Sequence, residues 1–178
     1  MSKLRIKIII VVIIFLAIAI FWYFYPKNYN KTLKGVFYLL EDENISENVK
    51  VHMDGKLQNY LFGKRKFEGK VELEGNNIPE VKGIDETGLE LWAEDRFGVL
   101  TSYGSVDEEG NYKPSVHFYG FVYVNKDFSQ LTIMITPEDE SGLWSETEQL
   151  VITAPAGNRD EAIEISNRLM EEYDLNRK

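Results

Sequence analysis

The histidines and the missing cysteine limit the chemistry that this chain can perform. His52 and His117 are the two histidines among 178 residues, and the chain has no cysteine. Without cysteine there is no disulfide, thiol nucleophile, cysteine zinc site or iron–sulfur cluster. A histidine base or metal site needs a partner at local spacing, and neither histidine has one. We therefore expect solvated or structural histidines, no catalytic residue, no metal site and no cofactor.

Acidic residues are the next candidates for chemistry, because three runs of them occur. None of the runs has the D-x-D-x-D-G spacing of a calcium loop, and adjacent side chains diverge, so solvated turns are expected. A glycosidase pair of distant carboxylates stays open as an alternative, since its members need not be neighbours in sequence. No G-x-S-x-G, Walker, G-x-G-x-x-G or H-E-x-x-H motif is present. The runs are Glu41-Asp42-Glu43, Asp107-Glu108-Glu109 and Glu138-Asp139-Glu140.

A short basic run is the first candidate for binding. Lys64, Arg65 and Lys66 stand together, with Lys70 nearby, in an otherwise acidic part of the chain. Such a run can contact anionic lipid headgroups or a phosphate-rich wall polymer. The alternative is that these charges are only solvated and protect the edge of a hairpin.

An aromatic group is the second candidate for binding. Strict alternation places His117, Tyr119, Phe121 and Tyr123 on one side of a strand, with Tyr112 close by. This side is either an exposed platform, on which Tyr119 and Tyr123 would contact a ligand, or a face that a C-terminal helix covers. We favour the covered face, because it explains why residues 116–124 are apolar on both sides.

The N-terminal segment is expected to place the rest of the chain at a membrane. Residues 8–25, IIIVVIIFLAIAIFWYFY, are apolar or aromatic without interruption, and Pro26 ends the run. At 1.5 Å per residue, a helix of this length spans about 27 Å, close to the hydrocarbon thickness of a bilayer. The bulky aromatics at its end resemble an interfacial belt and do not suit a signal-peptidase site. We predict an uncleaved transmembrane signal anchor, with the bilayer as its partner.

The charge distribution predicts the orientation of the chain in the membrane and excludes one class of partner. Lys3, Arg5 and Lys7 precede the apolar run, whereas all 29 acidic residues follow it. By the positive-inside rule, residues 1–7 form a cytoplasmic tail and the C-terminal domain lies outside the cell membrane. The acidic domain repels phosphate backbones, so no nucleic-acid partner is expected.

After the anchor, we expect a polar linker at residues 26–34 and then one β-rich domain at residues 35–178. Period-two alternation occurs in four stretches, where apolar residues occupy every second position. Residues 36–40 and 116–124 are apolar on both faces and are expected to be central strands, and a last strand is expected at residues 149–153. The turn signals are Asp54-Gly55, Gly75-Asn76-Asn77, Glu109-Gly110-Asn111 and Asn125-Lys126-Asp127, and the alternating sets are Val49, Val51 and Met53; Phe67, Val71 and Leu73; Leu89, Leu91 and Ala93; and Leu131, Ile133 and Ile135.

A helix is expected at residues 158–173. Asn158 is a good N-cap, and acidic residues follow in the first turn. Its apolar stripe, which includes Ile163, Leu169 and Met170, is expected to dock on the sheet, with Glu172 on the exposed face. The predicted fold is thus an N-terminal transmembrane helix plus a mainly-β (α+β) domain, an antiparallel sheet of roughly seven to nine strands with one C-terminal amphipathic helix.

One stretch carries a resemblance to known sequences. Residues 49–75, VKVHMDGKLQNYLFGKRKFEGKVELEG, contain Asp54-Gly55-Lys56, Leu61-Phe62, a basic run and Phe67-Glu68-Gly69. This pattern resembles small uncharacterised single-pass membrane proteins of Gram-positive bacteria. The resemblance implies location at a membrane and implies no particular activity.

Together these features predict a membrane-anchored extracytoplasmic domain that binds or scaffolds a partner at the cell surface. The expected partner is a cell-surface or membrane protein or a wall polymer. One alternative is a wall- or glycan-directed hydrolase that uses distant carboxylates, although the missing catalytic constellation favours a non-enzyme. A second alternative is an accessory subunit of a membrane complex.

Overall fold

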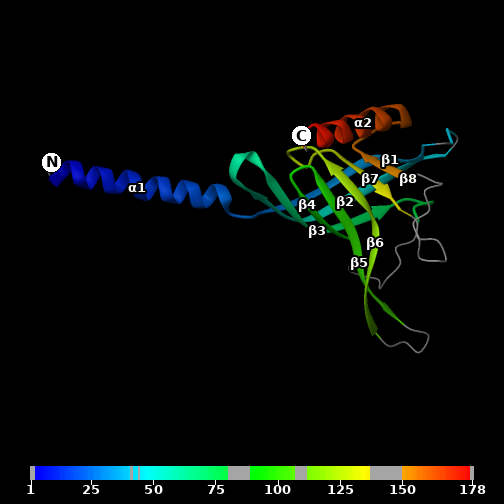
Figure 1. The fold of residues 1–178 in the computed structure, drawn as a ribbon, viewed down its shortest axis with the longest axis horizontal. Helices are drawn as coiled ribbons and strands as arrows, with labels where there is room; N and C mark the ends of the chain where they lie inside the picture. Colours follow the sequence, from blue (N-terminus) through cyan, green and yellow to red (C-terminus); the bar gives the residue numbers. More distant parts are fainter. Residues whose placement is uncertain are drawn as a thin grey trace.

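The computed structural model of the chain describes residues 3–40, 42–43, 45–79, 89–106, 112–136 and 150–176. A long helix, α1 (Lys3–Phe24), projects away from a β-barrel, and a second helix, α2 (Arg159–Asn176), lies against the outside of the barrel (Figure 1). Residues Lys7–Phe24 form an apolar window long enough to cross a membrane, and none of it is buried against the rest of the chain.

The barrel follows the chain in simple up-and-down order. In the part of the chain that the structure describes, eight antiparallel strands close into a barrel, with β8 pairing back to β1. This confirms the predicted mainly-β fold. The strands are β1 (Lys27–Leu39), β2 (Ser46–Asn59), β3 (Arg65–Glu74), β4 (Leu89–Glu94), β5 (Phe97–Val106), β6 (Tyr112–Val124), β7 (Leu131–Ile135) and β8 (Leu150–Ala154).

The inside of the barrel is filled with apolar side chains. An eight-stranded barrel has an interior only about wide enough for its own side chains. The alternating sets predicted from sequence point into it, and of their members only Leu73 is partly exposed. Large residues outside these sets complete the packing, among them Phe37, Leu100 and Phe128.

The predicted linker at residues 26–34 is wrong, because strand β1 begins at Lys27. Only two residues separate it from the end of α1 at Phe24. Tyr29 is buried in the core, and its hydroxyl donates a hydrogen bond to the carbonyl oxygen of Phe128. The polar residues of this stretch are exposed to solvent, so their composition resembled a linker.

The predicted turn at Asp54-Gly55 is also wrong, because β2 runs straight through it. Gly55 lies opposite Gly69 of β3. A Cβ on Gly55 would lie 2.4 Å from the carbonyl oxygen of Glu68, so glycine is needed for close approach of two backbones. Turns at Gly75-Asn76-Asn77 and Asn125-Lys126-Asp127 do follow β3 and β6, whereas Glu109-Gly110-Asn111 lies outside the described residues.

Helix α2 covers part of the outer surface, as predicted, but mainly over other strands. The backbone N–H of Glu161 donates to Asn158 Oδ1 at 2.9 Å, which confirms the N-cap. The buried side of α2 packs on β1 and β8, where the Tyr38 hydroxyl donates to Ser166 Oγ at 3.0 Å. Only its C-terminal part reaches β6, where Tyr173 lies beside Tyr123. The apolar cluster between helix and barrel consists of Val36, Tyr38, Val151, Ala156, Ala162, Ile165 and Leu169.

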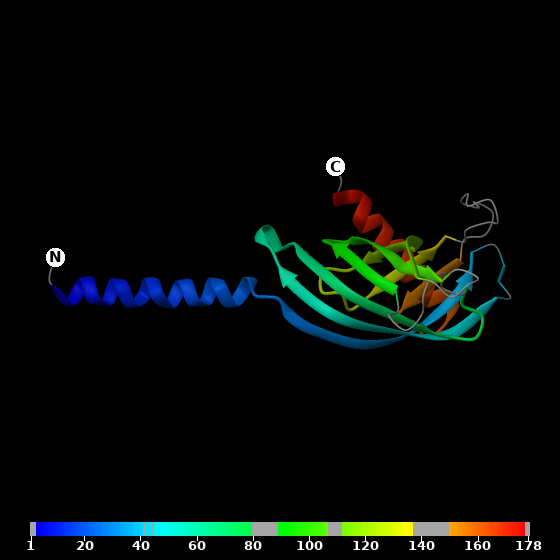
Figure 2. The ribbon, with the colours of Figure 1, turned by 90° about the horizontal axis from the view of Figure 1, so that it is seen from below.

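The two ends of the barrel differ in their connections. At the end nearer α1, the β4–β5 turn is Asp95-Arg96, and the β2–β3 and β6–β7 connections are short (Figure 2). At the other end, β3 ends at Glu74 and β4 begins at Leu89, and β7 ends at Ile135 and β8 begins at Leu150. We call these the membrane-proximal and membrane-distal ends, after the helix that is apolar enough to span a membrane.

Candidate membrane-proximal site

The β2–β3 hairpin extends past its neighbours at the membrane-proximal end. Strand β1 begins at Lys27, opposite Leu57, and β4 ends at Glu94, opposite Lys66. The connection, residues 60–64, therefore has no strand on either side, and we call it the hairpin tip. It is closed by the backbone N–H of Tyr60, which donates to the carbonyl oxygen of Lys64 at 2.8 Å.

The hairpin tip exposes large apolar side chains. Leu61 is 64% exposed and Phe62 is 99% exposed. Phe62 has φ 62°, in the left-handed region that favours glycine, and Gly63 follows with φ 76°. A bulky residue in this conformation is an outlier whose backbone strain needs compensation. The described chain supplies none, because Phe62 contacts almost nothing.

The predicted basic residues flank this tip. Lys64 is exposed and Arg65 is half-buried, and neither has an ion-pair partner among the described residues. Lys66 forms an ion pair with Glu68 and lies over the Trp92 ring, 5.4 Å from its centroid. The hydrogen bond to Glu68 raises the pKa of Lys66 above its ordinary value. Two of the three basic residues in this run thus remain available to an outside ligand.

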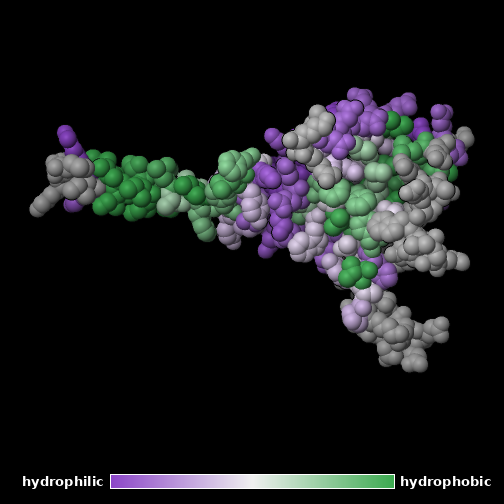
Figure 3. All heavy atoms as spheres, in the orientation of Figure 1, coloured by the Kyte–Doolittle hydropathy of each residue, from purple (hydrophilic) through white to green (hydrophobic). Residues whose placement is uncertain are grey.

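Two amide side chains join the hairpin to the end of α1. Gln58 Nε2 donates to the carbonyl oxygen of Phe24 at 3.2 Å, and Asn59 Nδ2 donates to that of Tyr23 at 3.0 Å. The last carbonyls of a helix have no partner inside the helix, so these amides act as its cap. The hairpin is thereby held at the level of the aromatic end of α1. In the space-filling view, the apolar surface of α1 continues to the near end of the barrel before a hydrophilic band begins (Figure 3).

The aromatic group on β6 does not form one surface. A register shift opposite Leu100 and Thr101 leaves Tyr119 as an extra residue on β6, which reverses the alternation. Tyr119 therefore points into the barrel, where its hydroxyl donates to the carbonyl oxygen of Pro79 at 3.0 Å. Tyr123 points outward and packs beside Tyr173 of α2. The prediction that these two tyrosines share one side is wrong, because strict alternation cannot anticipate a bulge.

Burial affects the acidity of these tyrosines. It raises the pKa of Tyr119, and it raises that of Tyr123 with further contributions from Tyr173 and Asp174. At the membrane-proximal end, burial and then the charge of Asp127 raise the pKa of Tyr29 to about 12. All three hydroxyls stay protonated at neutral pH and can donate hydrogen bonds. A buried neutral hydroxyl suits structural support more than nucleophilic or acid–base chemistry.

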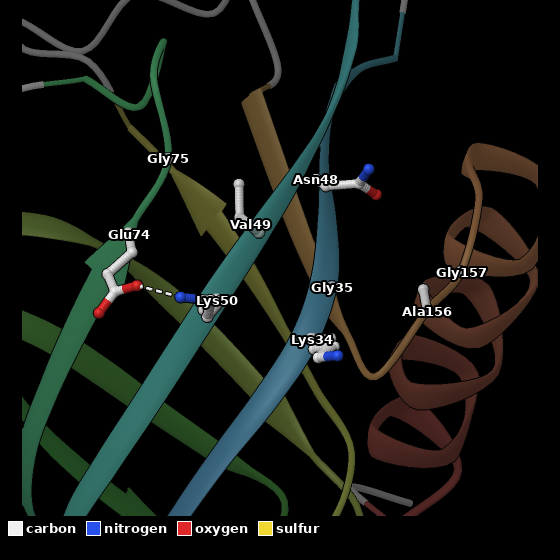
Figure 4. A pocket seen from close by; sticks show the side chains of 9 residues that line it. All are labelled: Lys34, Gly35, Asn48, Val49, Lys50, Glu74, Gly75, Ala156 and Gly157. Carbon is white, nitrogen blue, oxygen red and sulfur yellow. Dashed lines mark hydrogen bonds and ion pairs between the residues drawn. The ribbon is translucent and has the colours of Figure 1, made fainter.

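A groove lies on the membrane-distal half, across β1 and β2. It has a volume of about 540 Å³, and Figure 4 shows it extending from the Glu74–Lys50 pair to the segment that precedes α2. Lys50 Nζ and the Glu74 carboxylate are 2.7 Å apart, and this contact lowers the pKa of Glu74. Among the described lining residues Glu74 is the one carboxylate, so these residues do not supply the facing pair that a glycosidase needs.

The remaining candidates for chemistry are single hydrogen-bonded groups. His52 Nδ1 lies 2.8 Å from Thr32 Oγ1, and His117 Nε2 lies 3.0 Å from Ser115 Oγ. Within the described ranges, no three His, Asp or Glu side chains are grouped as metal ligands would be. The acidic runs fall mainly outside the described residues, apart from Asp42 and Glu43.

The sequence reasoning missed the apolar half of the hairpin tip. Residues 49–75 form the β2–β3 hairpin, and the Leu61-Phe62 pair is its turn. Turns favour glycine, proline, asparagine, aspartate and serine, so a Leu-Phe pair between a strand and a basic run was an available signal. The misplaced turn at Asp54-Gly55 concealed it.

Comparisons of the chain with protein-family models, with curated proteins and with solved structures found no match. The function is therefore inferred from the geometry of this chain.

Proposed function

We propose that this protein is a membrane-anchored extracytoplasmic barrel that binds or scaffolds a partner at the cell surface. The observation that carries the proposal is the filled barrel on an uncovered apolar helix. None of the residues Lys7–Phe24 is buried inside the structure, and the barrel contacts only their C-terminal end, so a bilayer is their natural environment. The barrel interior holds a continuous apolar core, so a partner must be recognised on the outside.

The membrane-distal end is the proposed binding end. Rigid scaffolds commonly carry their binding residues on the loops at one end. Here β3 and β7 end, and β4 and β8 begin, at the end that points away from α1, and the sequence between each pair of strands is longer than the membrane-proximal turns. The groove next to α2 opens beside the same end, at Gly75 and Gly157. A partner protein or a wall polymer would meet this end first.

Binding is preferred over hydrolysis because of what the groove contains. The carboxylate among its described lining residues, Glu74, forms an ion pair with Lys50, whereas a hydrolase needs an acid and a second carboxylate placed across the substrate. The resemblance of residues 49–75 to Gram-positive membrane proteins supports the location at a membrane. Release of soluble fragments from purified wall polymer by the full chain would replace the binding proposal with the hydrolase alternative.

The orientation is tested by reporter fusions after Lys178. A reporter that is active only outside the cytoplasm should work there, because Lys3, Arg5 and Lys7 precede the apolar helix. Activity of a cytoplasm-only reporter at the same position would overturn the orientation.

The binding end is tested by photo-crosslinking in living cells. A photoreactive residue is placed at Asn76, which is exposed near the membrane-distal end, and at Lys126, which is exposed in the membrane-proximal β6–β7 turn. We expect discrete protein or polymer adducts from position 76 and none of the same size from position 126. Adducts from position 126 alone would place the partner at the wrong end.

A further inference from the structure

The hairpin tip combines strain with exposure in a way that the barrel alone does not explain. Phe62 adopts a left-handed backbone conformation that glycine would adopt without strain. Its side chain is 99% exposed, so packing within the chain does not compensate for the strain. The exposed apolar pair Leu61-Phe62 therefore indicates contact with an apolar environment that is not part of this chain.

The position of the tip identifies that environment. Gln58 and Asn59 hydrogen-bond to the carbonyls of Phe24 and Tyr23, the final residues of the apolar helix. In a membrane helix, an aromatic cluster of this kind lies at the boundary between hydrocarbon and headgroups. The tip begins at the residue after Asn59, so it lies at the same boundary whenever α1 is inserted.

The composition of the tip fits that boundary. No acidic residue occurs from Leu57 to Phe67, although the chain holds 29 of them. Leu61 and Phe62 can enter the acyl region, and Tyr60 has an amphipathic ring of the kind found at headgroup depth. Lys64 and Arg65 are free to contact anionic headgroups.

We propose that the hairpin tip is a second membrane contact, which inserts Leu61 and Phe62 into the bilayer that α1 crosses. The occupant of this surface is lipid, with anionic headgroups bound by Lys64 and Arg65. Two attachments, α1 and the tip, hold the barrel at a defined tilt and keep its membrane-distal end directed away from the bilayer. This inference rests on the membrane anchorage in the proposed function, but it does not depend on which side of the membrane the domain occupies.

The test uses the full chain in lipid nanodiscs. Because the chain has no cysteine, Leu61→Cys gives a unique site for a nitroxide label, and Asn76→Cys gives a matched control at the membrane-distal end. The ratio of accessibility to oxygen over a water-soluble nickel complex reports depth. We expect a several-fold higher ratio at position 61 than at position 76, which should match water. Equal, water-like ratios in chains that are incorporated into nanodiscs would overturn the inference.

Two further experiments test the separate roles of Phe62 and of the basic residues. The substitution Phe62→Gly, made in the Leu61→Cys chain, should lower the ratio at position 61, since it removes apolar surface and keeps the turn conformation. An unchanged ratio would overturn the role of Phe62. Adding anionic phosphatidylglycerol to zwitterionic nanodiscs should deepen the label, and Lys64→Gln with Arg65→Gln should abolish this gain. If free inorganic phosphate, added to zwitterionic nanodiscs in place of phosphatidylglycerol, moved the label deeper, the assignment to lipid headgroups would be overturned.

The experiment distinguishes failure of the membrane anchor from failure of the second membrane contact. If α1 did not insert, the chain would not enter nanodiscs at all, and the proposed function would fail with it. If the chain entered nanodiscs and position 61 stayed water-accessible, only the second contact would be wrong.

Discussion

Two phenylalanines at the same end of the barrel share a backbone conformation and differ in almost everything else. Phe62 in the β2–β3 turn has φ 62°, and Phe128 in the β6–β7 turn has φ 59°. Phe62 is 99% exposed, whereas Phe128 is fully buried. Phe128 closes the end of the core against Phe67, with ring centroids 5.8 Å apart, and its carbonyl oxygen accepts a hydrogen bond from Tyr29.

The pair shows how the same local strain is compensated by different means. A left-handed conformation costs a non-glycine residue about 1–2 kcal/mol. Burial of a phenylalanine side chain contributes about 1.5–3 kcal/mol, so Phe128 recovers that cost inside the barrel. Phe62 recovers nothing from the chain, and the proposed membrane contact would supply the missing burial. The comparison makes quantitative predictions for residues 26–178, which hold the whole barrel and α2.

The largest expected effect is that of Phe128→Gly. Glycine relieves the backbone strain, but removing the ring leaves a cavity beside Phe67, so the free energy of unfolding should fall by about 3–5 kcal/mol. Denaturant melts measure this loss. A loss below about 1 kcal/mol would mean that the β6–β7 turn does not close the core, and the contrast with Phe62 would disappear.

The next largest effect is expected for Leu169→Ala, on the outer surface of the barrel that α2 covers. Leu169 is 1% exposed, and Leu169→Ala should lower the free energy of unfolding by about 2–5 kcal/mol. The matched control is Glu164→Ala on the exposed side of the same helix, which should change it by no more than about 0.5 kcal/mol.

Glu172 does not serve as that control, contrary to the sequence prediction. It forms an ion pair with Arg96 at the β4–β5 turn and is only partly exposed. Equal, small effects of the substitutions at Leu169 and Glu164 would show that α2 is not docked on the barrel.

A smaller effect concerns pH and the hydrogen bond to the Phe128 turn. Burial and Asp127 raise the pKa of Tyr29 to about 12, so the folded state favours the neutral hydroxyl. This stabilisation is fully present below the ordinary tyrosine pKa of about 10 and is lost as pH rises through about 12. Stability should therefore fall across this window by no more than about 2–3 kcal/mol on account of Tyr29.

The variant Tyr29→Phe isolates this contribution. Its stability should be lower at neutral pH, because the hydrogen bond to Phe128 is gone, and should decline less between about pH 10 and 12. Parallel pH profiles for the two chains, measured by chemical denaturation, would contradict the role given to Tyr29.

The smallest expected effect is that of Phe62→Gly in solution. The substitution relieves strain and removes no buried surface, so the free energy of unfolding should stay unchanged or rise by up to about 1 kcal/mol. Thermal and denaturant melts of residues 26–178 measure it. A loss of more than about 1 kcal/mol would show that Phe62 packs on the barrel after all, and the membrane would not be needed to explain it.

Prediction from sequence succeeded where a local pattern of residues is compatible with only one structure. The alternating sets at Val49, Val51 and Met53 and at Leu131, Ile133 and Ile135 all face the core, because period two leaves a half-buried strand no other choice. The last strand and the N-cap at Asn158 were likewise confirmed. The helix was expected to bury Ile163 and Met170, but Ile165 is more buried than either, because docking across β1 and β8 rotates the covered side.

Prediction failed where a residue type serves several purposes. Gly55 was read as a turn glycine, but it lets β2 and β3 approach closely. Of the candidate binding residues, Lys64 and Arg65 lie together at the hairpin tip, Lys66 is paired with Glu68, Tyr119 is inside the barrel and Tyr123 is under α2. Whether any of them binds a ligand stays a prediction.

The sequence by itself determined the elements whose signal is local: an apolar run long enough to span a bilayer, alternating strands and a capped amphipathic helix. Each of these follows from the spacing of side chains along one segment, since a helix or strand presents that spacing directly to its surroundings. Only the tertiary structure decided that the sheet closes, that a bulge turns Tyr119 inward and that the Leu61-Phe62 turn reaches the end of α1. Those facts depend on register and on which ends meet in space, and the chain specifies them only through contacts between residues far apart in sequence.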